Sequence, residues 1–315
     1  MNDREIAIVA RRLTRHFGRK AAVRNMDLAV PRGSVFALLG RNGAGKTTAI
    51  RMFLGLLDPS WGSAEVLGAP CRRIPPEVRG RIGYLTEGHP LIAWMRVGEL
   101  GRFQSRFYPA WNEGVFRTVT AHFRLDPMAR AGTLSRGERA GLCLALTLAP
   151  EPDLLVLDDP ALGLDPVARR SLLEALIYSI RKEGRTILFS SHLLSDVERV
   201  ADHVAVLDEG VLRAHCPIET FRSRVRRYVL KFTGDPPRIP DFPGSLQSVR
   251  GPKDVQVTVV AAAEGPPEAL RGLGATVEEV PLSLEEAFLA YLGDRGEKTL
   301  LAGAAEDPLT EEVTS

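Results

Sequence analysis

Residues 40–47, with the sequence GRNGAGKT, fit the pattern G-x-x-x-x-G-K-[ST] and constrain the fold more than any other part of the chain. An apolar run typical of a strand, Val35–Leu39, precedes the pattern, and a periodic segment typical of a helix, Lys46–Leu57, begins within it. Glycines let the backbone N–H groups of such a loop point at phosphate oxygens, and the helix start adds a partial positive charge. The sequence therefore predicts a strand, a phosphate-binding loop and a helix in succession, and with them a nucleotide site.

The side chains at the end of this loop have predicted roles of their own. We expect Lys46 to neutralise the β- and γ-phosphates and the Thr47 hydroxyl to bind Mg²⁺. The predicted nucleotide-binding residues of the loop are Gly40, Arg41, Asn42, Gly43, Ala44, Gly45, Lys46, Thr47 and Thr48.

A second magnesium ligand is predicted where Leu154–Leu157, an apolar run of strand length, is followed by Asp158 and Asp159. We expect Asp158 to hold Mg²⁺ through its water shell. Asp159 lies one residue further along, so it is the candidate to face the γ-phosphate and to orient or deprotonate the attacking water. The alternative for both residues is a pair of carboxylates at a solvated strand end.

Strands that alternate with helices predict an α/β fold, with a mostly parallel sheet covered on both faces. The expected strands, besides those named above, are Ile6–Val9, Met26–Val30, Thr186–Phe189 and Val204–Leu207, and the expected helices are Pro166–Lys182 and Leu193–Val200. The segment Met95–Phe123 is predicted to form an inserted helical subdomain. Its apolar side chains recur at helical spacing and are expected to pack in a core: Phe103, Phe107, Phe116, Val119 and Phe123.

A composition shift near Phe221 predicts a second, small α+β domain over residues 228–293, with strands at Tyr228–Phe232 and Val255–Val260. Ser283 and Glu286 form a capping box pattern, after which one helix face carries Leu284, Ala287, Phe288, Tyr291 and Leu292. Residues 294–315 are small, polar and mostly acidic, which predicts a disordered tail. The arginines within 222–227 could meet lipid headgroups or form a solvated, salt-bridged face.

Composition excludes several classes of protein. With 41 Lys and Arg against 39 Asp and Glu, the net charge of +2 gives no reason to expect a nucleic-acid partner. The longest nearly unbroken apolar stretch, Leu142–Ala149, is less than half of the roughly 20 residues that cross a bilayer. The three cysteines are far apart and predict neither a zinc site nor a disulfide framework, and the N-terminus lacks the layout of a secretory signal. An intracellular protein is expected.

With these motifs in place, the chain resembles the ATP-binding subunits of ABC transporters over roughly residues 4–220. The segment Leu134–Glu138, LSRGE, is similar to the family signature LSGGQ, and it lies about 20 residues before the strand that ends at Asp158. The resemblance implies a P-loop NTPase fold of the ABC ATPase type over residues 4–221, with the helical subdomain at about 88–133, and ATP as the nucleotide. In the family the signature binds the γ-phosphate of ATP held by a second subunit, which implies that role for Ser135 and Gly137.

The resemblance extends to other residues around the nucleotide. The segment Ala161–Asp165 is similar to the loop that couples the two sites of the family's dimer, which makes Asp165 a further nucleotide-site residue. His192 stands at the position of the family's switch histidine and is expected to hydrogen-bond the γ-phosphate. Phe17 occupies the position of the aromatic residue that stacks on adenine, although a lone phenylalanine there could equally be a core residue.

Departures from the family pattern surround the γ-phosphate. Asp159 replaces a Glu and is shorter by one methylene, which predicts slow but real ATP hydrolysis. Glu87 replaces a Gln, and we expect it to act near the reacting phosphate and as a further magnesium ligand. Arg136 and Glu138 replace Gly and Gln in the signature, and Arg136 could either reach the partner's nucleotide or point to solvent.

The function implied by the resemblance is ATP hydrolysis that drives a separate integral-membrane permease through nucleotide-dependent dimerisation, in an exporter. The chain is then expected at the cytoplasmic face of the membrane, with residues 87–94 docking on the permease and a second ATP-binding subunit completing the site. Two alternatives stay open: a slow or regulatory subunit of a heterodimer, and a non-transport ABC ATPase. The second domain could regulate the ATPase or serve as a strut that widens the dimer interface.

Overall fold

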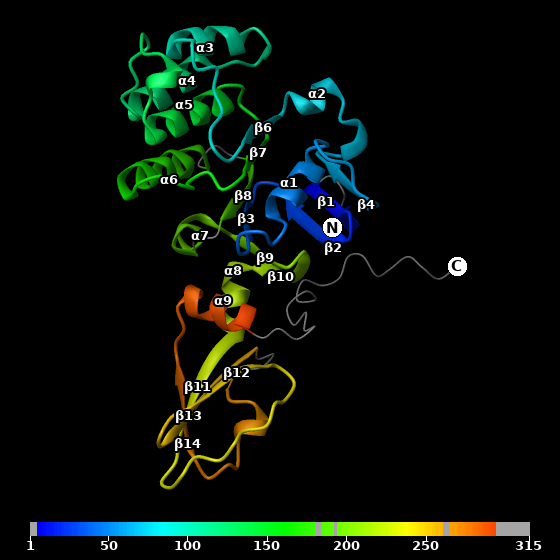
Figure 1. Ribbon diagram of the computed structural model, residues 1–315, viewed down its shortest axis with the longest axis vertical. Helices are drawn as coiled ribbons and strands as arrows, with labels where there is room; N and C mark the ends of the chain where they lie inside the picture. The colour runs from blue at the N-terminus through cyan, green and yellow to red at the C-terminus, as the bar shows by residue number, and fades with distance from the viewer. Residues whose placement is uncertain (1–4, 181–183, 192–193, 261–264, 294–315) are drawn as a thin grey trace, which may run out of the picture. The chain divides into compact units, whose positions relative to one another are not determined.

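The structure is a computed structural model that describes residues 5–180, 184–191, 194–260 and 265–293 (Figure 1). The chain divides into two compact units, residues 1–212 and 213–315, each of which is described by itself. The predicted tail, residues 294–315, and the predicted switch residue His192 lie outside the described residues. In the part of the chain that is described, no helix combines the length and the apolar character needed to cross a membrane.

The first unit is built on one sheet, whose strands follow the order β5-β4-β1-β2-β10-β9-β3-β8-β7-β6. Strands β9, β3, β8, β7 and β6 pair in parallel, whereas β2, β1, β4 and β5 pair antiparallel. Strand β10 joins the two parts through a parallel pairing with β2. The strands are β1 Ile6–Phe17, β2 Lys20–Pro31, β3 Val35–Leu39, β4 Trp61–Val66, β5 Ala69–Pro70, β6 Ile82–Leu85, β7 Leu154–Leu157, β8 Thr186–Ser191, β9 His203–Asp208 and β10 Val211–Pro217.

The helices of the first unit cover this sheet and form the inserted subdomain. They are α1 Lys46–Phe53, α2 Pro76–Arg79, α3 Val97–Ser105, α4 Glu113–His122, α5 Arg136–Leu148, α6 Pro166–Ile180 and α7 Leu194–Val200, with short 3-10 turns at Cys71–Arg73 and Ala131–Thr133. Helices α3 and α4 both pack against α5, so the three form the helical subdomain seen in green in Figure 1. An added Cβ on Gly141 of α5 would come within 2.2 Å of the Phe123 ring, so this glycine allows the close contact.

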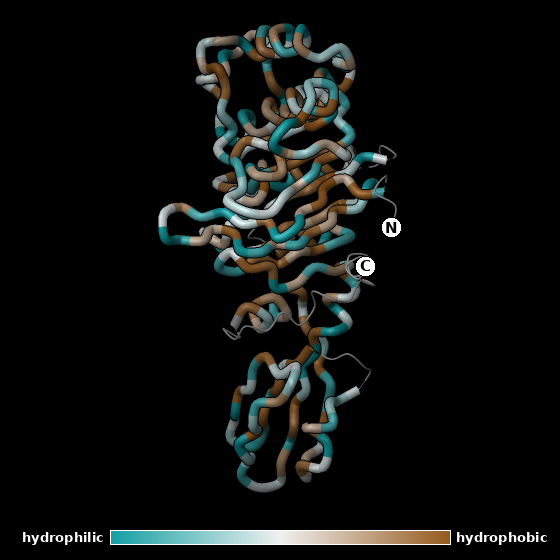
Figure 2. The backbone as a smooth tube through the Cα atoms, turned by 90° about the vertical axis from the view of Figure 1, so that its right-hand side faces the viewer, coloured by the Kyte–Doolittle hydropathy of each residue, from teal (hydrophilic) through white to brown (hydrophobic). Residues whose placement is uncertain are grey.

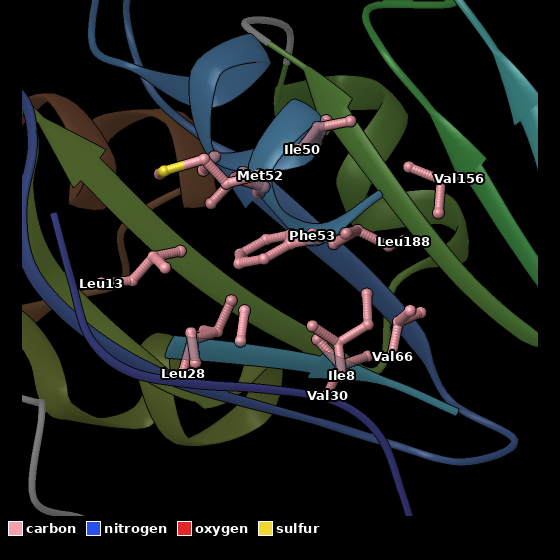
Figure 3. Packing of buried hydrophobic residues seen from close by; sticks show 14 of the residues in the cluster. Ile8, Leu13, Leu28, Val30, Ile50, Met52, Phe53, Val66, Val156 and Leu188 are labelled. Carbon is pink, nitrogen blue, oxygen red and sulfur yellow. The ribbon is translucent and has the colours of Figure 1, made fainter. Parts of the chain in front are cut away.

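The main core holds α1 against the sheet. Ile50, Met52 and Phe53 of α1 are fully buried and face side chains from the antiparallel strands, such as Leu13 and Leu28 (Figure 3). The hydropathy colouring of Figure 2 shows hydrophobic stretches that alternate with hydrophilic ones along the chain. Strands β3 and β7 are buried along their whole length, as expected of parallel strands with both faces covered. This packing fixes the start of α1 at the end of β3.

Two details of the first unit differ from the sequence prediction. Helix α1 ends at Phe53 instead of Leu57, because Gly55 adopts a left-handed φ of 64° that ends the helix. The aromatic stripe is not one buried face: Phe116 is buried, but Phe103 and Phe107 are 47% and 66% exposed, so the core prediction is wrong for these two. Helix α3 ends at Ser105, so Phe107 lies outside it and the helical spacing does not continue into α4.

The second unit consists of a small antiparallel sheet in the order β12-β13-β11-β14 and its flanking helices. Its elements are α8 Ile218–Arg224, β11 Val225–Lys231, β12 Ser245–Arg250, β13 Asp254–Val260, β14 Thr276–Val280 and α9 Leu284–Gly293, with a 3-10 turn at Glu268–Leu270. The predicted capping box is present: Ser283 Oγ accepts a hydrogen bond from Glu286 N, and Ser283 N donates to Glu286 Oε2. The predicted apolar face of α9 lies in the interior, except that Leu292 is half-buried.

Three of the four arginines in residues 222–227 form ion pairs. Arg222 pairs with Glu219, Arg226 with Glu279 and Arg227 with Glu286. These pairs correspond to the salt-bridged face, one of the two interpretations that the sequence offered for these arginines.

Candidate functional site

The predicted phosphate-binding loop connects the buried strand β3 to helix α1, and two of its glycines are required by close backbone approaches. A Cβ on Gly40 would lie 2.4 Å from the carbonyl oxygen of Leu207, and one on Gly45 would lie 2.3 Å from that of Ala22. Gly45 also has a φ of 108°, which side chains rarely adopt. The loop is thus held against β2 and β9 with its backbone turned toward the start of α1, which is the geometry that a phosphate needs.

Lys46, the first residue of α1, is almost fully buried at 5% exposure. Its Nζ donates a hydrogen bond to the Gly40 carbonyl at 2.8 Å and lies 3.5 Å from Asp159 Oδ2. The ammonium group therefore lies inside the curve of the loop. A buried charge placed among a carbonyl and a carboxylate is available to an anion that enters the loop.

Asp158 and Asp159 lie directly after β7, and the neighbouring strand β8 holds both through Ser190. The Ser190 hydroxyl donates to Asp158 Oδ1 at 2.9 Å and accepts from Asp159 N at 2.8 Å. Thr47 Oγ1 donates to the same Asp158 oxygen at 3.1 Å. A threonine hydroxyl beside a buried carboxylate is the hard-oxygen donor pair that Mg²⁺ prefers, so these residues fit the predicted metal.

Asp159 has a left-handed φ of 44°, which is unusual for a residue other than glycine. Its carboxylate lies 3.5 Å from Lys46 Nζ. Strained backbone of this kind is common at functional sites because the surrounding structure must hold it in place.

An open cleft with an empty volume of about 1020 Å³ gathers most of the predicted site residues. Side chains and backbone from distant parts of the sequence line it: Phe17, Asn42, Gly43, Gly45, Lys46, Thr47, Thr48, Glu87 and Asp159. Lys20, Ala22 and Leu162 also line the cleft and were not predicted. The position of Lys20 could have been predicted from Gly18, because a turn at this glycine pairs Lys20 with Phe17 across the β1–β2 hairpin.

The predicted signature segment forms the start of helix α5. Ser135 is the N-cap: its Oγ accepts a hydrogen bond from Glu138 N at 3.3 Å, and its N–H donates to Glu138 Oε2 at 2.8 Å. Glu138 therefore completes a capping box, a role that explains its place in this sequence. Gly137 allows close packing on α6, because a Cβ there would lie 2.7 Å from that of Ala168.

Two further predicted residues take part in contacts within the chain. Arg136 Nη1 donates to the carbonyl of Gly163 at 3.4 Å, so the exposed guanidinium contacts the loop that precedes α6. Asp165 Oδ1 accepts hydrogen bonds from Val167 N and Ala168 N, which caps the start of α6. The described residues that line the cleft include neither Asp165 nor any residue of 134–138.

Comparisons with known proteins decide the family. The family model described as ABC transporter matches residues 23–162. The Bacitracin transport ATP-binding protein BcrA of Bacillus licheniformis is 34% identical over 220 residues, which is 69% of this chain and 72% of that protein. The Nod factor export ATP-binding protein I of Cupriavidus pinatubonensis is 33% identical over 294 residues, 90% of each chain. This chain belongs to the ATP-binding subunits of ABC transporters.

Solved structures agree with this assignment. A structure described as the ATP binding subunit of an ABC transporter superposes with a TM-score of 0.62 at 27% identity, over 69% of this chain and 92% of that one. The ATP-binding cassette MJ0796, solved as a dimer bound to ADP and Pi, has a TM-score of 0.59 at 18% identity, over 67% of this chain and 98% of that one, and shows the shared fold. The predicted α/β fold of the P-loop NTPase type is therefore confirmed, and this ABC subunit is an ATP-binding protein and an ATPase.

Proposed function

We propose that this ABC subunit hydrolyses ATP to drive a separate transmembrane permease, through nucleotide-dependent association of two ATP-binding subunits, and that it serves export. The observation that carries the proposal is the division of the site within one copy: Asp158 and Asp159 contact Thr47 and Lys46 of the phosphate loop, whereas Ser135 caps another helix and does not line the cleft. The named export and transport functions of the relatives support the direction. We also propose that the chain has the two domains expected from its sequence, an ABC ATPase domain over residues 4–221 and an accessory domain over residues 228–293.

Within one copy, the chain's residues have the following proposed roles. Phe17 stacks on the adenine, the backbone of residues 40–48 binds the phosphates, and Lys46 neutralises their charge. Thr47, Asp158 and Glu87 are the candidate ligands of Mg²⁺, which when bound offsets the negative charge of the phosphate oxygens. Asp159 orients or deprotonates the attacking water, with its backbone held by Ser190.

Between two copies, the start of α5 completes the site. The Ser135 hydroxyl accepts from Glu138 N, so its own hydrogen remains available to donate to a γ-phosphate of the other subunit. The partial positive charge at the start of this long helix favours the same anion. Association of the two subunits would then depend on bound nucleotide, and hydrolysis followed by product release would separate them.

Nucleotide-dependent association is testable in a variant in which hydrolysis is arrested. With Asp159→Asn and ATP–Mg²⁺, we expect a monomer-to-dimer shift in light scattering or sedimentation, and a loss of at least tenfold in dimer affinity when Ser135→Ala is added. Ser283→Ala is the matched control, because it removes an equivalent capping-box serine in the second unit and should leave dimerisation unchanged. If ATP–Mg²⁺ leaves the arrested protein monomeric both alone and with the permease, the proposal fails.

A groove between β6 and the helical subdomain is the proposed docking surface for the permease. It has an empty volume of about 740 Å³ and begins directly before Glu87, at Tyr84–Thr86. Ile92 and Phe103 line it and are exposed, and Trp94 is exposed nearby. Exposed apolar side chains around a groove are typical of a protein interaction site. A permease segment docked in the groove would therefore lie beside Glu87, which lines the nucleotide cleft.

We expect Phe103→Asp to abolish docking while sparing the ATPase, because the carboxylate would be buried unpaired in the interface. Co-purification with the permease should fall at least tenfold, with ATP turnover of the isolated subunit within twofold of wild type. Leu289→Asp introduces the same charge at an exposed apolar position of α9 and should leave co-purification intact. Unchanged co-purification of Phe103→Asp would place the docking surface elsewhere.

A further inference from the structure

Phe17 presents an aromatic ring at the edge of the nucleotide cleft, and a cation covers one of its faces. The side chain is 51% exposed and lines the cleft at the end of β1. The guanidinium carbon of Arg15 lies 4.9 Å from the centre of the Phe17 ring, within the range of a cation–π contact. Side chains two residues apart in a strand share a face, which is why Arg15 reaches this ring.

Arg15 is itself fixed to the segment that follows α1. Its Nη1 donates to the carbonyl of Asp58 at 2.8 Å, and the Nε atom is buried with no hydrogen-bond partner among the described residues. Next to it, His16 N donates to Ser60 Oγ at 3.1 Å, which ties the same stretch of β1 to the same segment. The guanidinium therefore keeps its place over the ring through contacts that originate outside β1.

This arrangement connects the ring to the phosphate site through α1. The helix begins at Lys46 in the phosphate loop, and the chain that leaves its other end supplies the Asp58 carbonyl that holds Arg15. Phe17 is thus connected to the loop through Arg15, Asp58 and α1 as well as through the β1–β2 hairpin.

The cation also changes what the other face of the ring attracts. The face of an aromatic ring is negative, so two stacked rings repel each other electrostatically unless they are offset. A guanidinium on one face draws electron density away from the other face, which favours stacking of a purine there, and Arg15 itself is not among the residues that line the cleft. The planar guanidinium suits this place better than a lysine ammonium, which does not lie flat on a ring.

We propose that Arg15 is a positioning residue for nucleotide binding: it holds Phe17 and polarises the ring, so that arginine, phenylalanine and the purine of a nucleoside triphosphate form a three-layer stack. The inference rests on the proposed role of Phe17 as the base-stacking residue. It adds a residue that touches neither the base nor the phosphates and acts on affinity through the ring.

The test compares ligands with and without a base on the full chain. Calorimetry measures the dissociation constants of the slowly hydrolysed analogue AMP-PNP and of inorganic tripolyphosphate, which lacks a base, for wild type, Arg15→Leu, Arg15→Lys and Phe17→Leu. We expect Arg15→Leu to weaken AMP-PNP binding by about threefold to tenfold and Arg15→Lys by less, with tripolyphosphate affinity within twofold of wild type.

Arg11→Leu is the matched control, since it removes the same charge from the same strand at an exposed position paired with Glu65. It should change neither affinity by more than twofold. Thermal melting of each variant shows whether it folds, and Arg15→Lys provides the same ligand comparison if Arg15→Leu does not.

The outcomes separate this inference from the function on which it rests. If Phe17→Leu leaves AMP-PNP affinity unchanged, base stacking at Phe17 is wrong and the inference falls with it. If Phe17→Leu weakens AMP-PNP alone but neither Arg15 variant does, the base-stacking role stands and the role of Arg15 is overturned. Equal losses for AMP-PNP and tripolyphosphate in the Arg15 variants overturn it as well, because Arg15 would then act through charge or fold.

Discussion

Replacing Lys46 with methionine is expected to lower ATP affinity and steady-state phosphate release by at least a hundredfold. The ammonium group is buried within the phosphate loop, 2.8 Å from the Gly40 carbonyl, so the water that could screen a surface charge has little access to it. Hydrogen bonds to a charged group contribute about 1.5–3 kcal/mol each, and an approaching triphosphate offers more than one acceptor. The measurements are calorimetric titration with AMP-PNP and phosphate release at saturating ATP.

The matched control is Lys20→Met, which makes the same substitution in the same cleft at an exposed position. Its effect on affinity should stay within threefold, because the charge of an exposed lysine is screened by water and salt. If the two variants lose affinity equally, the general positive charge of the cleft would bind the phosphates and the buried position of Lys46 would have no special role. A thermal melt excludes unfolding as the cause in either variant.

The parts of the fold that were predicted from the sequence are those whose signal is local. Strands β3 and β7 are unbroken apolar runs buried on both faces, and their predicted bounds match the structure. The phosphate loop follows from residue types at fixed spacing, because only glycine allows the approaches that Gly40 and Gly45 make to neighbouring carbonyls. The capping box before α9 is equally local and is present.

The parts that were missed depend on neighbours far away in the sequence. Strands β4, β12 and β14 mix exposed and polar residues, and they became strands through pairing with β1, β13 and β11. Periodicity predicted a buried face for Phe103, but a side chain on a helix is covered only where another element packs on it, and Phe103 lines an open groove instead.

The contact of Arg15 with the Asp58 carbonyl joins residues 43 apart, and no spacing rule predicts it. The same is true of Arg136, for which the sequence offered either the partner's nucleotide or solvent. Its guanidinium contacts Gly163, a residue 27 positions later, because the starts of α5 and α6 lie close together. Functional contacts made by long, flexible side chains are thus the least predictable part of this site.

Replacing Asp159 with asparagine is expected to reduce the catalytic rate at least a hundredfold, with ATP affinity within threefold of wild type. Asparagine keeps the size of the side chain and the backbone hydrogen bond to Ser190, but it loses the negative charge that orients or deprotonates water. Asp153→Asn is the matched control, because that carboxylate is only half-buried, pairs with Arg81 and lies just before β7. If Asp159→Asn is as active as wild type, residue 159 is not the catalytic carboxylate.

Asp159→Glu tests whether the missing methylene limits the rate. In the structure the carboxylate lies 3.5 Å from Lys46 Nζ, and the hydrogen bond from Asp159 N to Ser190 Oγ opposes a shift of the main chain that would extend its reach. A displacement of about 1 Å can cost on the order of a hundredfold in rate. We therefore expect Asp159→Glu to raise the rate about tenfold in steady-state phosphate release. A slower Asp159→Glu variant would mean that the left-handed turn at residue 159 already positions the shorter side chain, and that hydrolysis in this subunit is limited by another step, such as closure of the dimer.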